Sequence, residues 1–163
     1  MTELSTLKEQ VCNSIDKNRD MLLSISHEIH SNPELAFEEF KASKLLSDES
    51  EKVGMKVVRE AYGLETAYAS DFGNDGPRVA ILSEYDALPG IGHSCGHNII
   101  ATTGFGAAAA LLEVKDSLPG SIRYLGTPAE ERGGGKEFMA QEGAFEEVNA
   151  AMMVHPAGVD LST

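Results

Sequence analysis

The sequence predicts a single-domain α/β fold, and three observations support this prediction. Short apolar runs that are typical of strands alternate along the chain with longer segments of helical periodicity. Residues 79–82 are almost wholly apolar, as expected for a strand that is covered on both faces. The chain has 163 residues, of which 42% are hydrophobic, and this is enough for one domain with a buried core.

The first third of the chain predicts two helices. Apolar residues recur at helical spacing over residues 7–30, which predicts one long helix. This helix should end before Pro33, because a proline disfavours the α conformation in the residue that precedes it. Residues 37–53 predict a second helix, and Gly54 follows it as a C-terminal cap.

The middle of the chain predicts short strands and a buried helix. The three β-like runs are residues 56–58, 66–69 and 78–82. A turn at residues 73–77 joins the last two runs, and a loop over residues 84–95 follows them. Residues 97–114 are apolar and rich in Ala and Gly, so we expect a helix that packs closely on the sheet.

The last third predicts two more strands, at residues 121–126 and 150–154, of which the second should be buried. A polar loop over residues 127–135 and a helix that begins at residues 136–141 lie between them. Residues 158–163 close no element of structure. We therefore expect residues 1–163 to be the N-terminal part of a longer domain.

Composition excludes several classes of function. The formal net charge is −13, which argues against nucleic-acid and anionic-membrane partners, since both require basic patches. Two cysteines are too few for a disulfide framework. The N-terminus has no apolar signal-peptide core, and no window is long enough for a transmembrane helix. These features predict a cytoplasmic protein.

Chemically active side chains fall where predicted strands end and where the buried helix begins. In open α/β sheets, ligands bind at the carboxyl ends of the strands. We therefore expect these side chains to meet at one edge of the sheet. They are Asp86, Cys95, His97, Glu130, Glu131 and His155.

Cys95 and His97 stand two residues apart, and Gly96 lets the backbone turn so that both can face one point. A helix N-terminus should lower the pKa of the thiol and favour the thiolate, which is the form that binds metal. Cysteine, histidine and carboxylate together suit zinc, with manganese or cobalt as alternatives. A buried cysteine beside an unrelated histidine would give the same pattern.

Glu130 and Glu131 are adjacent carboxylates in a Gly-rich loop. On an extended chain their side chains should point apart, so that one can bind metal while the other holds a water. Metal-assisted hydrolysis needs this division of roles. A solvated acidic turn is the simpler alternative.

Three further residues have equally simple alternatives. His155 ends an apolar strand, where histidines are more often satisfied rim residues than ligands. His93 could support a ligand from behind. Asp86 could orient a ligand, or could cap the turn that follows it.

Five ordered segments resemble the amidohydrolase branch of the aminoacylase/carboxypeptidase metallopeptidase family, which includes hippurate, indole-acetyl-amino-acid and aminobenzoyl-glutamate hydrolases. They are HSNPEL at 30–35 with Glu39 behind it, SEYDALP at 83–89, HSCGHN at 93–98, TPAEE at 127–131 and MVHP at 153–156. The Glu-Tyr-Asp and Cys-Gly-His-Asn variants look most like the Xaa-Arg type dipeptidase subgroup. The resemblance spans nearly the whole chain.

The resemblance implies a three-layer α/β/α catalytic domain with a mixed sheet and two divalent metal ions, zinc before manganese or cobalt. Cys95 would bridge the ions, and His97, Glu131 and His155 would be ligands. Glu130 would be the general base, and Asp86 would support the site.

Members of this family are more than twice as long as this chain. They insert a lid and dimerisation domain after a point near residue 163, and a final ligand histidine comes later still. The resemblance implies a homodimer for the full-length protein and little or no activity for this part alone. Ser94 replaces the usual alanine, which should be harmless.

Three functions compete at this point. The first is metal-dependent hydrolysis of an N-acyl amino acid or a dipeptide. The second is a catalytically inactive metal-binding fragment or interaction module, which would have no need for Glu130. The third is a thiol enzyme with Cys95 as its nucleophile, which would need no metal.

Overall fold

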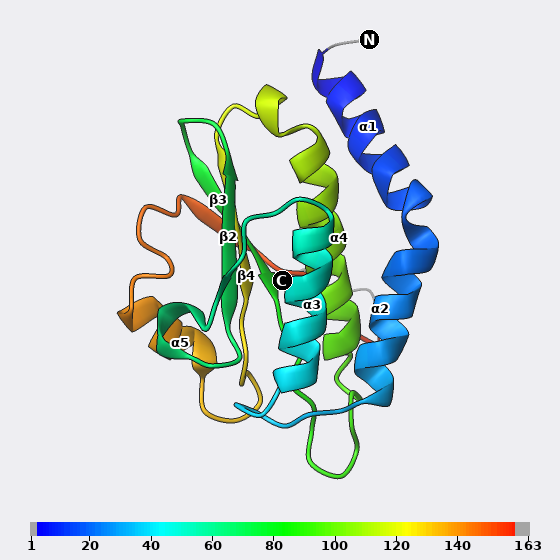
Figure 1. The fold of residues 1–163 in the computed structure, drawn as a ribbon, viewed down its shortest axis with the longest axis vertical. Helices are drawn as coiled ribbons and strands as arrows, with labels where there is room; N and C mark the ends of the chain where they lie inside the picture. The colour runs from blue at the N-terminus through cyan, green and yellow to red at the C-terminus, as the bar shows by residue number, and fades with distance from the viewer. Residues whose placement is uncertain (1–2, 159–163) are drawn as a thin grey trace.

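The computed structural model describes residues 3–158. Most of the C-terminal segment that was expected to close no element of structure, residues 159–163, lies outside this range. The chain forms a mixed five-stranded sheet with helices on both sides (Figure 1). The helices α1 to α4 lie on one side of the sheet, and α5 lies on the other. The predicted α/β fold and mixed sheet are confirmed. None of the described helices is long and apolar enough to cross a membrane.

The expected long N-terminal helix is instead two helices, α1 (Glu3–Lys17) and α2 (Arg19–Ser31). The break falls at Asn18, whose side-chain amide donates a hydrogen bond to the carbonyl oxygen of Ser14 at 2.9 Å. An asparagine side chain that competes for backbone partners in this way disfavours the helix interior. The prediction of a single helix was therefore wrong, although the stop before Pro33 is confirmed.

The second helix, α3 (Phe40–Lys52), begins three residues later than predicted. Phe37 has a φ of 65°, which is incompatible with a right-handed helix. The helix start is capped by Glu34, whose carboxylate accepts hydrogen bonds from the backbone N–H groups of Lys41 and Ala42 at 2.9 Å. A carboxylate at this position also interacts favourably with the helix dipole.

The sheet has the order β1-β2-β4-β3-β5. Its strands are β1 (Val58–Arg59), β2 (Tyr68–Gly73), β3 (Arg78–Ser83), β4 (Ser121–Gly126) and β5 (Ala150–Met152). The pairs of β3 with β4 and of β3 with β5 are parallel, whereas β2 runs antiparallel to β4. The carboxyl ends of β3, β4 and β5 therefore lie at one edge of the sheet.

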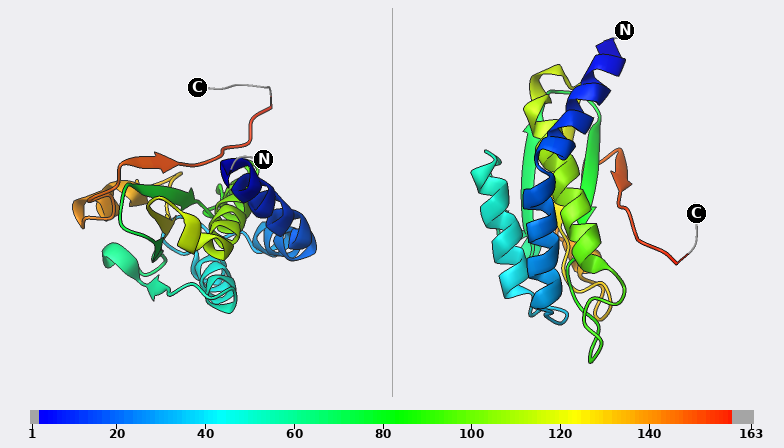
Figure 2. Two further views of the ribbon diagram at one scale, coloured as in Figure 1. Left: turned by 90° about the horizontal axis from the view of Figure 1, so that it is seen from above. Right: turned by 90° about the vertical axis from the view of Figure 1, so that its right-hand side faces the viewer.

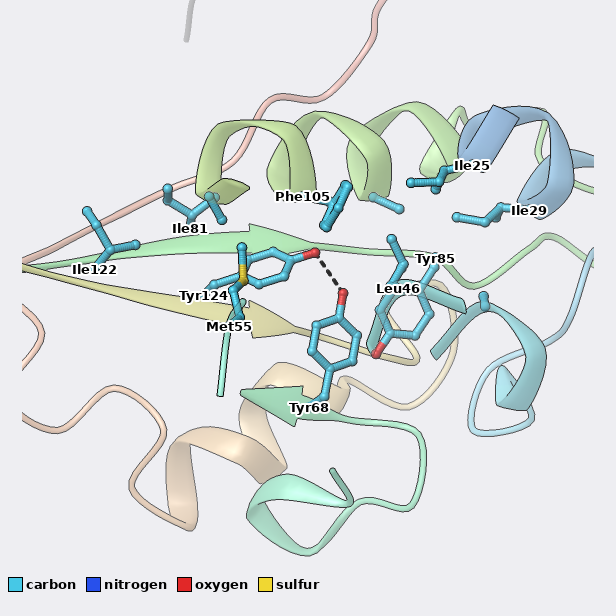
Figure 3. Packing of buried hydrophobic residues seen from close by; sticks show 13 residues of the cluster. Ile25, Ile29, Leu46, Met55, Tyr68, Ile81, Tyr85, Phe105, Ile122 and Tyr124 are labelled. Carbon is cyan, nitrogen blue, oxygen red and sulfur yellow. Dashed lines mark hydrogen bonds between the residues drawn. The ribbon is translucent and has the colours of Figure 1, made fainter. Parts of the chain in front are cut away.

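Alternate residues of the central strands fill two separate cores. Ile81 and Tyr124 face α2, α3 and α4, and Tyr124 exchanges a 2.8 Å hydrogen bond with Tyr68 (Figure 3). Ala80 and Leu125 point the other way, towards α5 (Gly135–Gln141). This period of two is what a sheet covered on both faces requires.

The helix α4 (His97–Glu113) is buried and packs closely on the sheet, as predicted. A Cβ added to Gly104 would lie 2.4 Å from the hydroxyl oxygen of Ser83 and 2.7 Å from the carbonyl oxygen of Leu82. Only glycine allows this approach, which brings the middle of α4 next to the end of β3.

The strand β5 is exposed, so the prediction of a buried last strand was wrong. It lies at an edge of the sheet, pairs only with β3, and is shorter than expected (Figure 2). Met152 and Val154 are each about 60% exposed. An edge strand of three residues covers too little of its own surface to bury these side chains.

Candidate metal centre

The six residues singled out from the sequence converge at the predicted edge of the sheet. Asp86 follows β3, Glu130 and Glu131 follow β4, and His155 follows β5. Cys95 precedes α4, and His97 is the first residue of that helix. The ends of β3, β4 and β5 and the start of α4 therefore meet at one edge of the sheet, as expected.

His97 lies at the middle of this group and is fully buried. Its Nδ1 donates a hydrogen bond to Oδ1 of Asp86 at 3.0 Å, since an ionised carboxylate can only accept. The proton on Nδ1 leaves the lone pair on Nε2. Burial lowers the pKa of His97, but the neighbouring carboxylates of Asp86 and Glu131 outweigh it and raise the pKa above its ordinary value.

Three carboxylates surround the free Nε2 of His97. Oε2 of Glu84 and Oε2 of Glu130 each lie 3.8 Å away, and Oε1 of Glu131 lies 3.7 Å away. These distances are too long for hydrogen bonds, and Nε2 is buried without a hydrogen-bond partner. Two atoms that bind the same zinc ion, each about 2.0–2.2 Å from it, lie roughly 3–4 Å apart. The spacing therefore fits a cation between these groups.

Cys95 and His155 form the other side of the centre. Sγ of Cys95 lies 3.4 Å from Nε2 of His155, and the rings of His97 and His155 are 5.8 Å apart. Nδ1 of His155 donates to the carbonyl oxygen of Pro156 at 2.8 Å, so its Nε2 faces the site and is the acceptor for the thiol of Cys95. Histidine ligands are commonly oriented by a backbone carbonyl in this way.

The expected effect of the helix start on Cys95 is wrong for the metal-free protein. Burial, together with the carboxylates of Glu131, Glu130 and Asp86, raises the pKa of this thiol to about 11. Burial and these negative charges therefore outweigh any effect of the helix N-terminus on the thiol. Without a cation the thiol stays protonated at neutral pH.

The two adjacent glutamates lie in a turn rather than on an extended chain. The expectation that they would point apart is therefore wrong, since both face Nε2 of His97. They differ in exposure: the side chain of Glu130 is 41% exposed and that of Glu131 is 19% exposed. The backbone N–H of Glu131 donates to Oδ2 of Asp86 at 2.9 Å, so Asp86 holds both His97 and this turn.

Sequence reasoning missed two residues at this site. Glu84 is fully buried, and the ammonium group of Lys136 contacts its Oε1. Glu84 follows the same strand as Asp86 and lies two residues before it, so its place at a strand end could have indicated it equally well. Lys136 gave no comparable signal, because a lysine at the start of a helix is ordinarily solvated.

His93 is buried behind the site, and neither ring nitrogen has a hydrogen-bond partner. Burial, together with the neighbouring His97 and His30, lowers the pKa of His93 to about 4. Its ring lies 6.4 Å from that of His30. His93 is therefore neutral at physiological pH and touches none of the six residues through a hydrogen bond.

Within the described residues, two groups of potential ligand atoms each lie within 4.8 Å of one another. They are Cys95, His97 and His155, and Glu84, His97 and Glu130. Thiolate, imidazole and carboxylate together are the donor set that zinc takes in proteins. His97 belongs to both groups, and its unpartnered Nε2 can bind one ion, so the residues present fit a divalent cation at this edge.

Comparison with known proteins gives an independent result. The sequence profile of peptidase family M20/M25/M40 matches residues 80–161, which contain every residue of the site. The chain is 40% identical over 169 residues to the Xaa-Arg dipeptidase of Mus musculus, covering 95% of this chain and 39% of that protein. It is 35% identical over 162 residues to a p-aminobenzoyl-glutamate hydrolase chain of Escherichia coli (strain K12), covering 88% of this chain and 34% of that one.

A similar fold occurs in a solved structure from Bacillus subtilis, a dinuclear metal-binding peptidase. That structure superposes with a TM-score of 0.78 and 26% identity, over 83% of this chain and 42% of that chain. The chain thus spans between 34% and 42% of the length of these three proteins.

Proposed function

Because the chain belongs to peptidase family M20/M25/M40, we propose that the protein is a metal-dependent hydrolase that cleaves the amide bond of a dipeptide or an N-acyl amino acid. One observation carries the proposal. The buried Nε2 of His97 has no hydrogen-bond partner and faces three carboxylates at 3.7–3.8 Å. Such an arrangement is costly unless a cation occupies it.

We assign the binding of two divalent ions to Cys95, His97, Glu131 and His155, with Cys95 shared between the ions. Zinc suits this donor set best, and manganese or cobalt could replace it. The similarity to a dinuclear peptidase supports the number of ions. When bound, the ions would acidify a coordinated water and polarise the substrate carbonyl.

Glu130 is the proposed general base. Its carboxylate reaches to 3.8 Å from Nε2 of His97 but is more exposed than that of Glu131, so it faces the side from which water and substrate arrive. From this position it can accept a proton from the attacking water and pass it to the leaving nitrogen. Asp86 does not touch the substrate in this scheme; it orients His97 and the turn of Glu131.

The mouse and Escherichia coli relatives indicate the size and kind of substrate, a dipeptide or an acylated amino acid. The net charge of −13 makes a nucleic-acid or anionic-membrane partner unfavourable. A homodimer in the cytoplasm completes the proposal for the full-length protein.

A panel assay tests the proposed reaction. The full-length gene product is purified, stripped with a chelator, and incubated with dipeptides that end in a basic residue and with N-acyl amino acids. We expect hydrolysis only after Zn²⁺, Mn²⁺ or Co²⁺ is restored. Bound metal without turnover on any substrate would favour an inactive metal-binding protein. Turnover that survives the chelator and stops on alkylation of Cys95 would favour a thiol enzyme.

A further inference from the structure

Glu39 is a fully buried carboxylate that the proposed reaction does not use. It stands at the position before α3, and each of its oxygens accepts one hydrogen bond. Oε1 accepts the backbone N–H of Ala129 at 2.8 Å, and Oε2 accepts the hydroxyl of Thr66 at 2.8 Å. Glu39 thus joins the start of a helix to the loop that follows β4.

Ala129 has an unusual backbone conformation. Its φ is +58°, in the left-handed region that residues with a side chain rarely adopt, and it is fully buried. Such a conformation persists only where the surroundings hold it. Its N–H is bound by Glu39, and its carbonyl oxygen accepts the N–H of Gly135 at 3.1 Å.

The turn at Ala129 sets the direction of both glutamates. Glu130 follows it directly, and the N–H of Glu131 is held by Oδ2 of Asp86 at 2.9 Å. Two buried carboxylates therefore hold the backbone on either side of Glu130: that of Glu39, which precedes α3, and that of Asp86, which follows β3. Both glutamates then face Nε2 of His97.

We propose that Glu39 is a positioning residue for the metal centre: by binding the N–H of Ala129 it maintains the left-handed turn that aims Glu130 and Glu131 at His97. The inference rests on the proposed function only in that it takes these glutamates as residues of a metal site. Glu39 itself touches neither metal nor substrate.

In this proposal the turn depends on the position of the Glu39 oxygen that accepts the N–H of Ala129, and the negative charge of Glu39 has no role. Glu39→Gln keeps the reach, since the amide oxygen can accept from Ala129 while the amide nitrogen donates to Thr66. Glu39→Asp keeps the charge but is one methylene shorter, so it cannot hold both partners from the same backbone position. The two variants separate geometry from electrostatic attraction of the metal.

The test measures the zinc dissociation constant of the chelator-stripped, full-length gene product by competition with a chromogenic chelator. We expect Glu39→Gln to bind zinc like the parent. Glu39→Asp should bind about 10–100-fold more weakly, the usual cost of disturbing a group behind the ligands. The reverse order would show that charge is what matters and would overturn the proposal.

A second substitution acts on the turn itself. Glycine adopts a positive φ readily, so Ala129→Gly should restore most of the zinc affinity lost in Glu39→Asp. If Glu39→Asp alone does not fold, the double variant Glu39→Asp/Ala129→Gly still tests the proposal, because glycine at position 129 should restore both folding and zinc affinity. Failure to recover either one counts against the proposal.

Thr66→Val provides the matched control, because it removes the other hydrogen bond of Glu39 and leaves the bond to Ala129. It should reduce stability to urea while zinc affinity stays near that of the parent. An equal loss of zinc affinity in Thr66→Val and Glu39→Asp would contradict the proposal, because it would show that Glu39 acts only through the general stability of the core. Zinc binding is read without substrate, so a protein that binds zinc but hydrolyses nothing would refute the proposed function and leave this inference standing.

Discussion

Asp86 and His97 are joined by a 3.0 Å hydrogen bond between two fully buried side chains. The bond fixes which nitrogen of His97 carries the proton and directs the other nitrogen at the carboxylates of the site. Burial alone would raise the pKa of Asp86, but the hydrogen bonds from His97 and the backbone of Glu131 outweigh it and keep the pKa below its ordinary value.

We expect Asp86→Asn to weaken zinc binding about 10–100-fold. Asparagine has a single acceptor oxygen, so either His97 or the N–H of Glu131 would then face an amide N–H group. Chelator competition measures the change. Asp71→Asn is the control, since Asp71 is also a doubly bonded carboxylate but accepts from Arg123 on the sheet surface. Equal affinities for Asp86→Asn and the parent would show that Asp86 does not support the site.

The two cysteines should react differently with iodoacetamide in the metal-free protein. The pKa of Cys95 is raised to about 11 by burial and by Glu131, so little thiolate is present at neutral pH. Cys12 is exposed on α1 and serves as the internal control. Peptide mass spectrometry at pH 7 should find Cys12 labelled well before Cys95, with labelling of Cys95 rising only as the pH approaches 11. Equal rates at pH 7 would contradict the assigned environment.

The stability of Glu39→Gln relative to the parent should depend on pH. Burial raises the pKa of Glu39 above its ordinary value of 4.5, against the lowering effect of the hydrogen bonds from Thr66 and Ala129. A raised carboxyl pKa stabilises the fold below pH 4.5, and this contribution is lost as the pH rises through the folded-state pKa. Glutamine does not titrate, so the free energy of unfolding of the variant should rise relative to that of the parent between pH 4 and pH 7.

Urea unfolding of the metal-free proteins at several pH values measures this difference. Glu9→Gln, on the exposed surface of α1, controls for loss of a carboxylate elsewhere. A stability difference between Glu39→Gln and the parent that is constant from pH 4 to pH 7 would contradict the raised pKa.

Lys136→Met should destabilise the metal-free protein, because it leaves the buried carboxylate of Glu84 without its partner. Breaking a buried ion pair costs about 3–5 kcal/mol of unfolding free energy, and the partial exposure of Lys136 favours the lower end. The double variant Glu84→Gln/Lys136→Met should regain most of the loss. Lys44→Met, which breaks the exposed pair with Asp48, should cost no more than about 1 kcal/mol. Similar losses of unfolding free energy in Lys136→Met and Lys44→Met would argue against a buried ion pair between Lys136 and Glu84.

The elements that could be predicted from the sequence are those whose pattern is set by burial. The strand β4 and the helix α4 have nearly the predicted bounds, because most of their side chains are apolar or small and each ends at a glycine or a polar residue. The break at Asn18 could not be predicted in this way, since it depends on a side chain competing for one backbone carbonyl. The exposure of β5 depends on its place at the sheet edge, which periodicity does not reveal.

The sequence predicted which six side chains would lie close together, but it did not predict how they are oriented. Strand ends and a helix start indicated the six residues, and the structure brings them together. The direction of Glu130 and Glu131 could not be predicted, because it depends on the left-handed turn at Ala129 and on Glu39, which lies 90 positions earlier in the chain. The role of Lys136 likewise depends on a tertiary contact with Glu84.

The most direct test of the central claim is the metal content and turnover of Glu130→Ala in the full-length gene product. Metal binding is assigned to Glu131 and proton transfer to Glu130, so this variant should retain about two ions per chain by elemental analysis and lose turnover by at least about 100-fold. Glu131→Ala, measured beside it, should lose metal. Loss of metal together with turnover in Glu130→Ala, or turnover that persists in this variant, would contradict the assignment.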